Sequence, residues 1–278
     1  MSARPLTVLV VGATGSIGRY VVEAALREGY GVRALVRNPA RSIALTAQAE
    51  QVVGDLTHPQ TLAAAVDGVD AIVFTHGSDG HGKAGAEQVD YGGVRNVLSA
   101  LSGRKARIAL MTAIGVTNRD GAYNCATQAH DWKRRSERLV RASGLPYTIV
   151  RPGWFDYNDA NQRRLVMLQG DTRHAGTPAD GVIARRQIAE VLVASLTLEQ
   201  ARNKTFELVA EVGPEPKDLA PLFAAVTADS GDFGKSPDGV GDARNMPLDQ
   251  EPPQVLADLK AIHPDGSDFV QLPNRGAS

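Results

Sequence analysis

The sequence predicts an α/β fold built on a Rossmann-like, doubly wound parallel sheet. Through the first 150 residues, apolar β-branched runs alternate with amphipathic helical stretches. A regular alternation of this kind is typical of βαβ units. The first apolar run also passes directly into a glycine-rich turn, Gly12-Ala-Thr-Gly15-Ser-Ile-Gly18, which opens a helix.

The expected strands are short and continuously apolar, so we expect both of their faces to be buried. They cover Thr7–Val11, Gly31–Val36, Gln51–Val53, Ala71–Thr75, Ile108–Thr112 and Tyr147–Val150. The helices between them are expected at Ile17–Glu28, Pro39–Ala47, Pro59–Val66, Gln88–Leu101 and His130–Ser143. The last of these carries an apolar stripe formed by Trp132, Ser136, Leu139 and Val140.

The pattern is weaker after Arg151 and is interpreted as the end of the same domain. Elements are expected at Leu165–Leu168 (strand), Arg186–Leu196 (helix), Thr205–Val209 (strand) and Lys217–Val226 (helix). We therefore expect one domain over residues 1–227, with a small substrate side built from about 152–185. Residues 228–278 are rich in Gly, Pro, Asp and Asn and are expected to form an irregular C-terminal extension with one short helix at Pro253–Ile262.

Composition excludes several classes of protein. The 278 residues include 30 Lys and Arg against 31 Asp and Glu, a balance that argues against binding to nucleic acid or to a membrane surface. The basic run Lys133, Arg134, Arg135, Arg138 and Arg141 is accordingly expected to be a solvated helix face. The single cysteine, Cys125, forms no internal disulfide and fits a reducing, cytoplasmic location. We expect no metal site, a small-molecule substrate as the partner, and a monomer or homodimer.

The glycine-rich turn has the spacing of a dinucleotide-binding loop. One glycine allows the tight turn, one allows a pyrophosphate to approach the backbone, and one allows the helix to pack against the strand. The phosphates then lie at the helix N-terminus, where free N–H groups point at them. The predicted contacts are Gly12, Thr14, Gly15, Ser16, Ile17 and Gly18.

The choice of nucleotide is predicted from the end of the second strand. An NAD-binding protein usually has Asp or Glu there, whereas this chain has Arg37, Asn38 and Arg41. A guanidinium can pair with a 2′-phosphate, so NADP(H) is favoured over NAD(H). Further contacts are expected at the ends of the next two strands, with Asp55 at the adenine amino group and Leu56, Thr75, His76 and Gly77 beside the cofactor.

These residues resemble the short-chain dehydrogenase/reductase superfamily, in particular its atypical NAD(P)H-binding, NmrA-like branch. The specific matches are Asp131-Trp-Lys-Arg-Arg-Ser-Glu and Pro146-Tyr-Thr-Ile-Val-Arg-Pro-Gly-Trp-Phe, and the likeness covers residues 6 to about 227. The resemblance implies that Lys133 contacts the nicotinamide ribose. It also implies that Pro152, Gly153 and Trp154 line the nicotinamide end of the site.

The chain departs from that superfamily at the proton donor. Typical members have a tyrosine four residues before the lysine, and here Ala129 stands at that position. The usual serine has Thr112 as its nearest counterpart. His130 and Tyr123 are possible substitutes for the tyrosine. The interpretation that we favour needs no protein acid, because a quinone- or flavin-like acceptor takes a hydride and then a solvent proton.

The predicted function is that of an NADP(H)-dependent oxidoreductase reducing a small organic acceptor: a quinone, a flavin or a carbonyl compound. The predicted catalytic residues are Lys133, Thr112 and His130. The alternative is a non-catalytic NADP(H)-binding redox sensor, which the missing tyrosine favours.

Overall fold

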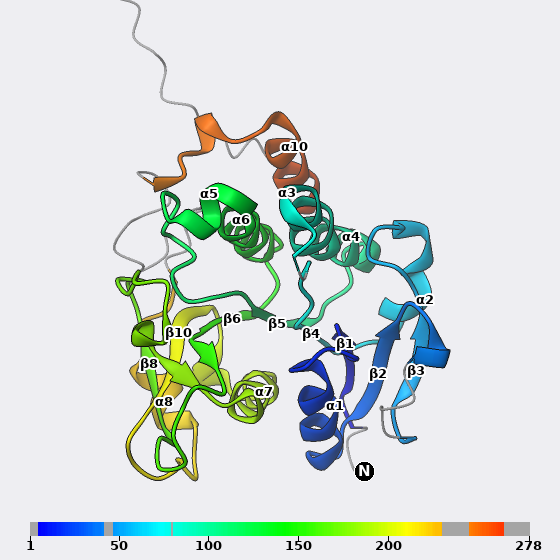
Figure 1. Cartoon of the computed structure of the whole chain (residues 1–278). Helices are drawn as coiled ribbons and strands as arrows, with labels where there is room; N and C mark the ends of the chain where they lie inside the picture. Colours follow the sequence, from blue (N-terminus) through cyan, green and yellow to red (C-terminus); the bar gives the residue numbers. More distant parts are fainter. Residues whose placement is uncertain (1–4, 42–46, 79, 230–244, 264–278) are drawn as a thin grey trace, which may run out of the picture.

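The computed structural model describes residues 5–41, 47–78, 80–229 and 245–263. Its strands form one sheet in the order β3-β2-β1-β4-β5-β6-β10-β9-β7, with β8 paired to β10 (Figure 1). The strands from β3 to β10 in this order run parallel, whereas β8 and β9 are antiparallel to β10. The predicted Rossmann-like, doubly wound sheet is confirmed.

The strand order reverses direction at β1, and this places the ligand crevice. β1 (Thr7–Val11) pairs with β2 (Gly31–Val36) on one side and β4 (Ala71–Phe74) on the other. In an open parallel sheet, ligands bind beyond the carboxyl ends of the strands at such a switch point. The remaining strands are β3 (Glu50–Val53), β5 (Arg107–Met111), β6 (Tyr147–Pro152), β7 (Trp154–Phe155), β8 (Arg164–Leu168), β9 (Val182–Ile183) and β10 (Lys204–Glu211).

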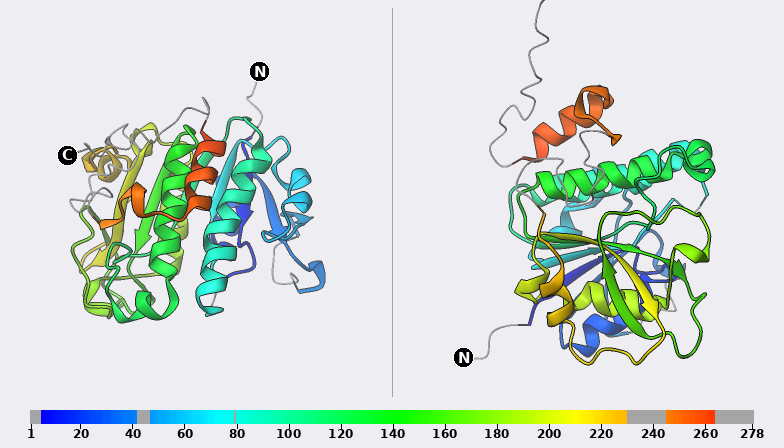
Figure 2. Two further views of the ribbon diagram at one scale, coloured as in Figure 1. Left: turned by 90° about the horizontal axis from the view of Figure 1, so that it is seen from above. Right: turned by 90° about the vertical axis from the view of Figure 1, so that its left-hand side faces the viewer.

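Helices cover both faces of the sheet, as Figure 2 shows. One face packs against α1 (Gly18–Arg27), α7 (Arg185–Ala194) and α8 (Ala220–Ala225). The other packs against α2 (Ala63–Val66), α4 (Gly92–Leu101) and α6 (Ala129–Ala142). None of the helices in the described ranges is both long and apolar enough to span a bilayer.

Several helices differ from their predicted bounds. The segment predicted to begin a helix at Gln88 is already helical from α3 (Gly82–Gly85), followed by a π-helical turn η3 (Ala86–Tyr91) before α4. The predicted helix Pro59–Val66 is divided into a 3-10 turn, Pro59–Thr61, and α2. The predicted helix Pro39–Ala47 is a 3-10 turn at Pro39–Arg41, and its remainder lies largely outside the described residues. Helix α5 (Ala122–Thr127) and the two-residue strands β7 and β9 were not predicted.

The C-terminal segment contains the predicted helix, α10 (Pro253–Ile262), which lies on the outer side of α6 and α4 (Figures 1 and 2). Val255 and Leu259 complete the apolar cluster of those two helices. Just before α10, the buried Glu251 pairs with Arg135 at 2.6 Å and with Arg138.

The prediction of a solvated basic face on α6 is therefore wrong. Arg134, Arg135 and Arg138 are 1%, 7% and 1% exposed, because the segment from Asn245 to Glu251 covers them. The sequence near α6 contains no hint of this, since the compensating carboxylate lies more than a hundred residues away.

Candidate functional site

The glycine-rich turn has the conformation that its spacing predicts. Gly12 has φ +88°, and a Cβ there would lie 2.7 Å from the main-chain nitrogen of His76. A Cβ on Gly18 would overlap the carbonyl oxygen of Gly12, so only glycine lets α1 pack this close to β1. These two contacts bring the start of α1 to the carboxyl ends of β1 and β4.

The turn that leads into α1 has main-chain N–H groups available as hydrogen-bond donors. Its N-cap residue, Ile17, makes no capping hydrogen bond through its side chain. Within the described parts of the chain, the N–H groups of Ser16 and Ile17 have no hydrogen-bond partner. Thr14, Gly15 and Ser16 are exposed beside them. Free N–H groups and the positive end of the helix dipole together favour an anion such as a pyrophosphate.

Arg37 follows directly after β2 and is exposed. Its guanidinium has no hydrogen bond or ion pair with any described residue, so it is available for a ligand. The neighbouring Asn38 uses its side-chain oxygen to accept a bond from Ala40 N–H at 2.9 Å, which shapes the turn. The side chain of Arg41, the second predicted cation, lies outside the described residues.

Asp55 is half-buried after β3 and is held in a fixed orientation. Its Oδ1 accepts bonds from the N–H and hydroxyl of Thr57, both at 2.8 Å. Partial burial opposes ionisation of Asp55, but the Thr57 bonds and the nearby His58 outweigh it and lower its pKa. The carboxylate is therefore charged at neutral pH and can accept a bond from an amino group. Leu56 beside it is anchored by Asn96, whose amide donates to the Leu56 carbonyl at 2.6 Å.

The segment after β4 borders the same crevice. Thr75 donates its hydroxyl to the Val11 carbonyl at 3.2 Å, which ties it to β1. His76 bonds through Nε2 to the Val89 carbonyl at 3.0 Å, so the ring proton lies on Nε2. Burial lowers the pKa of His76 to about 4 and keeps the ring neutral. Gly77 leads from His76 into Ser78, where the chain turns towards α3.

Lys133 projects from α6 with one-fifth of its side chain exposed. Its ammonium lies 2.7 Å from Oδ1 of Asp90, whose side chain is 1% exposed. Asp90 lies in the π-helical turn η3 and also accepts the Ser78 hydroxyl at 2.7 Å. Neither Asp90 nor Ser78 was among the predicted site residues, because only the fold brings them to Lys133.

The two other predicted catalytic side chains are engaged within the protein. Thr112 is 4% exposed and donates its hydroxyl to Glu137 at 2.8 Å. His130 bonds to the main chain of Asn118, and its buried Nδ1 has no partner among the described residues. Burial lowers the pKa of His130, so the ring is neutral at neutral pH. Tyr123 is 60% exposed, with its ring 5.1 Å from that of His130.

The predicted nicotinamide end follows β6. Pro152 is the last residue of that strand, and a Cβ on Gly153 would lie 2.5 Å from the Gly181 carbonyl oxygen. This close approach places Trp154 at the surface, 37% exposed. Its ring meets that of Tyr157 edge to face, with the centroids 6.0 Å apart. Tyr157 is 63% exposed, so both rings are open to solvent.

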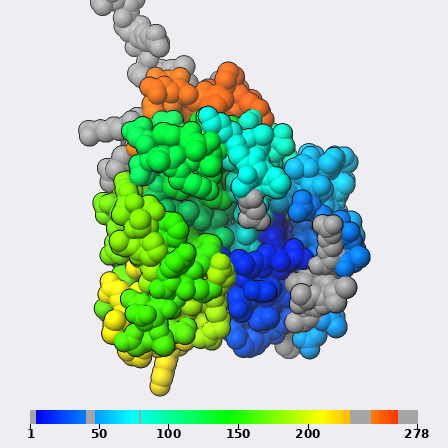
Figure 3. Space-filling model, viewed as in Figure 1, coloured from blue at the N-terminus to red at the C-terminus, as the bar shows by residue number. Residues whose placement is uncertain are grey.

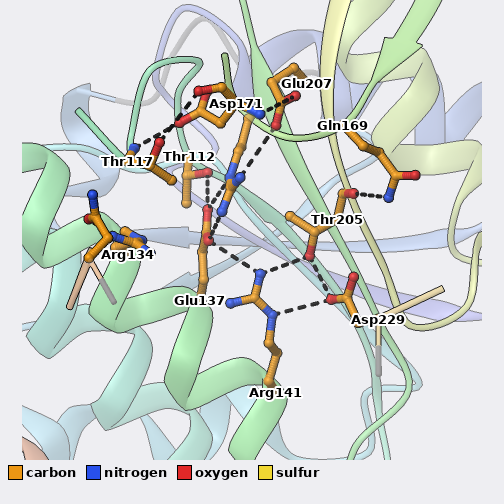
Figure 4. A network of polar contacts seen from close by, with 12 residues as sticks. Thr112, Thr117, Arg134, Glu137, Arg141, Gln169, Asp171, Thr205, Glu207 and Asp229 are labelled. Carbon is orange, nitrogen blue, oxygen red and sulfur yellow. Dashed lines mark hydrogen bonds and ion pairs between the residues drawn. The ribbon is translucent and has the colours of Figure 1, made fainter. Parts of the chain in front are cut away.

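A buried polar network, drawn in Figure 4, supports this side of the site. Glu137 of α6 takes two bonds from Arg151 of β6, at 2.9 and 2.6 Å, and Arg151 also pairs with Glu207 of β10. Asp171 extends the network, since its carboxylate accepts the N–H groups of Gly115 and Thr117 at 2.6 and 2.7 Å. The network thus fixes the loop that follows β5 and begins at Thr112.

Figure 3 shows the surface hollowed where the N-terminal segment, the segment after β4 and the segments from α5 to α7 meet. This hollow coincides with the switch point of the sheet. Among the described residues, no group of three His, Cys, Asp or Glu side chains is placed to hold a metal ion.

Comparison with known proteins agrees with this geometry. Residues 12–199 match the family model described as NAD(P)H-binding. Sanguinarine reductase of Eschscholzia californica is 29% identical over 81% of this chain and 98% of its own length. NAD(P)H azoreductase of Xenophilus azovorans is 29% identical over 81% of this chain and 74% of its own. A putative NAD-dependent epimerase/dehydratase of Bacillus halodurans has a similar solved structure, with 25% identity, a TM-score of 0.67 and coverage of 80% of this chain and all of that one. The chain therefore belongs to the NAD(P)H-binding family of Rossmann-fold proteins, in agreement with its resemblance to atypical short-chain dehydrogenases/reductases.

Proposed function

We propose that this protein is an NADP(H)-dependent reductase that acts on a small organic acceptor such as a quinone, a flavin or a carbonyl compound. The observation that carries the choice of NADP(H) is the exposed guanidinium of Arg37 at the end of β2. It stands where NAD-binding proteins place a carboxylate, and it can pair bidentately with a 2′-phosphate. The free N–H groups of Ser16 and Ile17 bind the pyrophosphate in this proposal.

The aromatic pair Trp154 and Tyr157 supports a planar, conjugated acceptor. The two exposed rings are nearly perpendicular, and the free face of either one can stack on a planar acceptor where the nicotinamide is expected. Two relatives carry names that refer to reduction of conjugated compounds, sanguinarine and azo compounds. Both observations favour a conjugated acceptor over a simple aldehyde or ketone.

The protonation step proceeds without a protein acid in this proposal. Ala129 occupies the position of the usual tyrosine, the Thr112 hydroxyl is bonded to Glu137, and burial keeps the His130 ring in its neutral form. When bound, the nicotinamide supplies the hydride. Lys133 holds the ribose, and the reduced acceptor takes its proton from water, as a hydroquinone or dihydroflavin product allows.

An acceptor screen tests this proposal. We expect the purified protein to oxidise NADPH faster with quinones or flavins than with simple aldehydes and ketones. We expect Trp154→Ala to raise the KM for the acceptor by a larger factor than the Kd for NADPH, because Trp154 is also predicted to line the nicotinamide end of the site. Phe155→Leu, which alters a neighbouring aromatic residue facing the core, is the matched control.

A non-catalytic redox sensor is the second candidate, favoured by the absence of a tyrosine at position 129. A sensor has to bind NADPH and NADP+ with different affinities and show no turnover. If no acceptor supports turnover and the protein binds NADPH and NADP+ with equal affinity, both candidates are contradicted. For either candidate we propose a cytoplasmic monomer or homodimer that binds no nucleic acid.

A further inference from the structure

Asp90 connects two segments that border the cofactor crevice. One of its carboxylate oxygens lies 2.7 Å from the Lys133 ammonium on α6. The other accepts the hydroxyl of Ser78 at 2.7 Å, and the Ser78 N–H lies 3.3 Å from the first. A single carboxylate therefore binds both α6 and the chain that follows β4.

The π-helical turn η3 places Asp90 in this position. The main chain is also fixed here, because the Asp90 carbonyl accepts the hydroxyl of Ser136 at 2.8 Å. The preceding Val89 carbonyl accepts the ring of His76. π-helical turns inside helices are often found at functional sites.

Asp90 is the charge partner of Lys133 among the described residues. Glu137, one turn along α6, is bound to Arg151 and Arg141. Asp131 is bound to Arg119. His76 and His130 also lie within electrostatic range of Lys133. Both rings are neutral, because burial lowers the pKa of each.

We propose that Asp90 is a positioning residue for the dinucleotide. Its carboxylate orients the Lys133 ammonium towards the nicotinamide ribose and holds the segment after β4 at the same point. The inference rests on the proposed function, since it takes Lys133 as a ligand of that ribose. A one-fifth exposed ammonium fixed by a buried carboxylate keeps its remaining N–H donors for a ribose hydroxyl, at a small cost in side-chain entropy.

The test compares two ligands that differ in the nicotinamide half. NADPH contains the nicotinamide ribose, whereas adenosine 2′,5′-bisphosphate is the adenosine half alone, with its 2′-phosphate and one 5′-phosphate. Titration calorimetry on the full chain measures the Kd of each for the wild type, Asp90→Asn, Lys133→Met and the double variant. Asp229→Asn is the matched control, because it removes another buried, ion-paired carboxylate.

We expect Asp90→Asn and Lys133→Met each to weaken NADPH binding about tenfold, and the double variant to bind no worse than Lys133→Met. The bisphosphate should bind all variants within about twofold of the wild type, as should NADPH to the control. A merely structural role for Asp90 predicts instead that both ligands weaken together, or that the two substitutions add. Either result overturns the inference, and so does unchanged NADPH binding by Asp90→Asn.

Failure of NADP(H) binding, the part of the proposed function on which the inference rests, looks different, because the wild type would then bind neither ligand. A crystal structure of the wild type with NADPH tests the inference even if the variants fail to fold. The inference requires the Lys133 ammonium to contact Asp90 and a ribose hydroxyl together. An ammonium turned away from Asp90 in the complex overturns it.

Discussion

Replacing Arg37 by aspartate should reverse the preference for the phosphorylated cofactor. The side chain is exposed and makes no bond to the described residues, so its replacement breaks no internal contact. Loss of one charge-assisted hydrogen bond to the 2′-phosphate costs about 1.5 kcal/mol at a solvated site, or about tenfold in affinity. Repulsion between the new carboxylate and the phosphate adds a similar amount, so the affinity ratio of NADPH to NADH should fall about a hundredfold.

The assay is fluorescence titration of both cofactors at low and moderate salt. Arg202→Asp is the control, because it makes the same charge change at an exposed site just before β10, which is remote from β2 in the sheet. The effect of Arg37→Asp should diminish with salt, since exposed charges are screened. An unchanged ratio of the two affinities would refute the assignment of Arg37 and the preference for NADP(H).

Three further substitutions or conditions test other parts of the structure. Gly18→Ala should abolish NADPH binding and lower the melting temperature, because its Cβ overlaps the preceding turn, whereas Gly31→Ala, with no neighbour closer than 3.7 Å, should have little effect. Glu251→Gln should lower the free energy of unfolding in urea by about 3–5 kcal/mol by stranding two buried arginines. The exposed Glu199→Gln should cost less than about 1 kcal/mol. His76 has a pKa of about 4 in the folded protein, below its unfolded value of 6.5, so stability should be complete above pH 6.5 and fall by up to about 1.4 kcal/mol per pH unit towards pH 4. The wild type should lose more stability over this range than His76→Asn, and equal losses would exclude His76 as the source.

Local patterns were sufficient to predict the nucleotide-binding half of the fold. The roles of Gly12 and Gly18 depend on backbone geometry within a single strand–turn–helix unit, so sequence spacing contains the necessary information. The position of Arg37 follows from the end of β2 for the same reason. Helix bounds were less accurate on both sides of β4: the predicted helix Pro59–Val66 is divided, and after β4 a π-helical turn extends the helix without changing the apolar pattern.

The interactions that depend on distant residues could not be predicted. Periodicity places Arg135 and Arg138 on the polar side of α6, but their burial depends on Glu251, which lies more than a hundred residues later. The partnership of Lys133 with Asp90 joins residues on two different helices. In both cases the sequence identifies a charge, and only the fold identifies its partner.

Reaction of the bound reduced cofactor with an acceptor tests the central claim most directly. The measurement mixes the protein, saturated with NADPH, with a quinone or flavin and follows the loss of NADPH absorbance in a single turnover. We predict oxidation much faster than in the absence of protein, with a matching yield of reduced acceptor. NADPH that binds but is not oxidised by any quinone, flavin or carbonyl compound would contradict the assignment as a reductase.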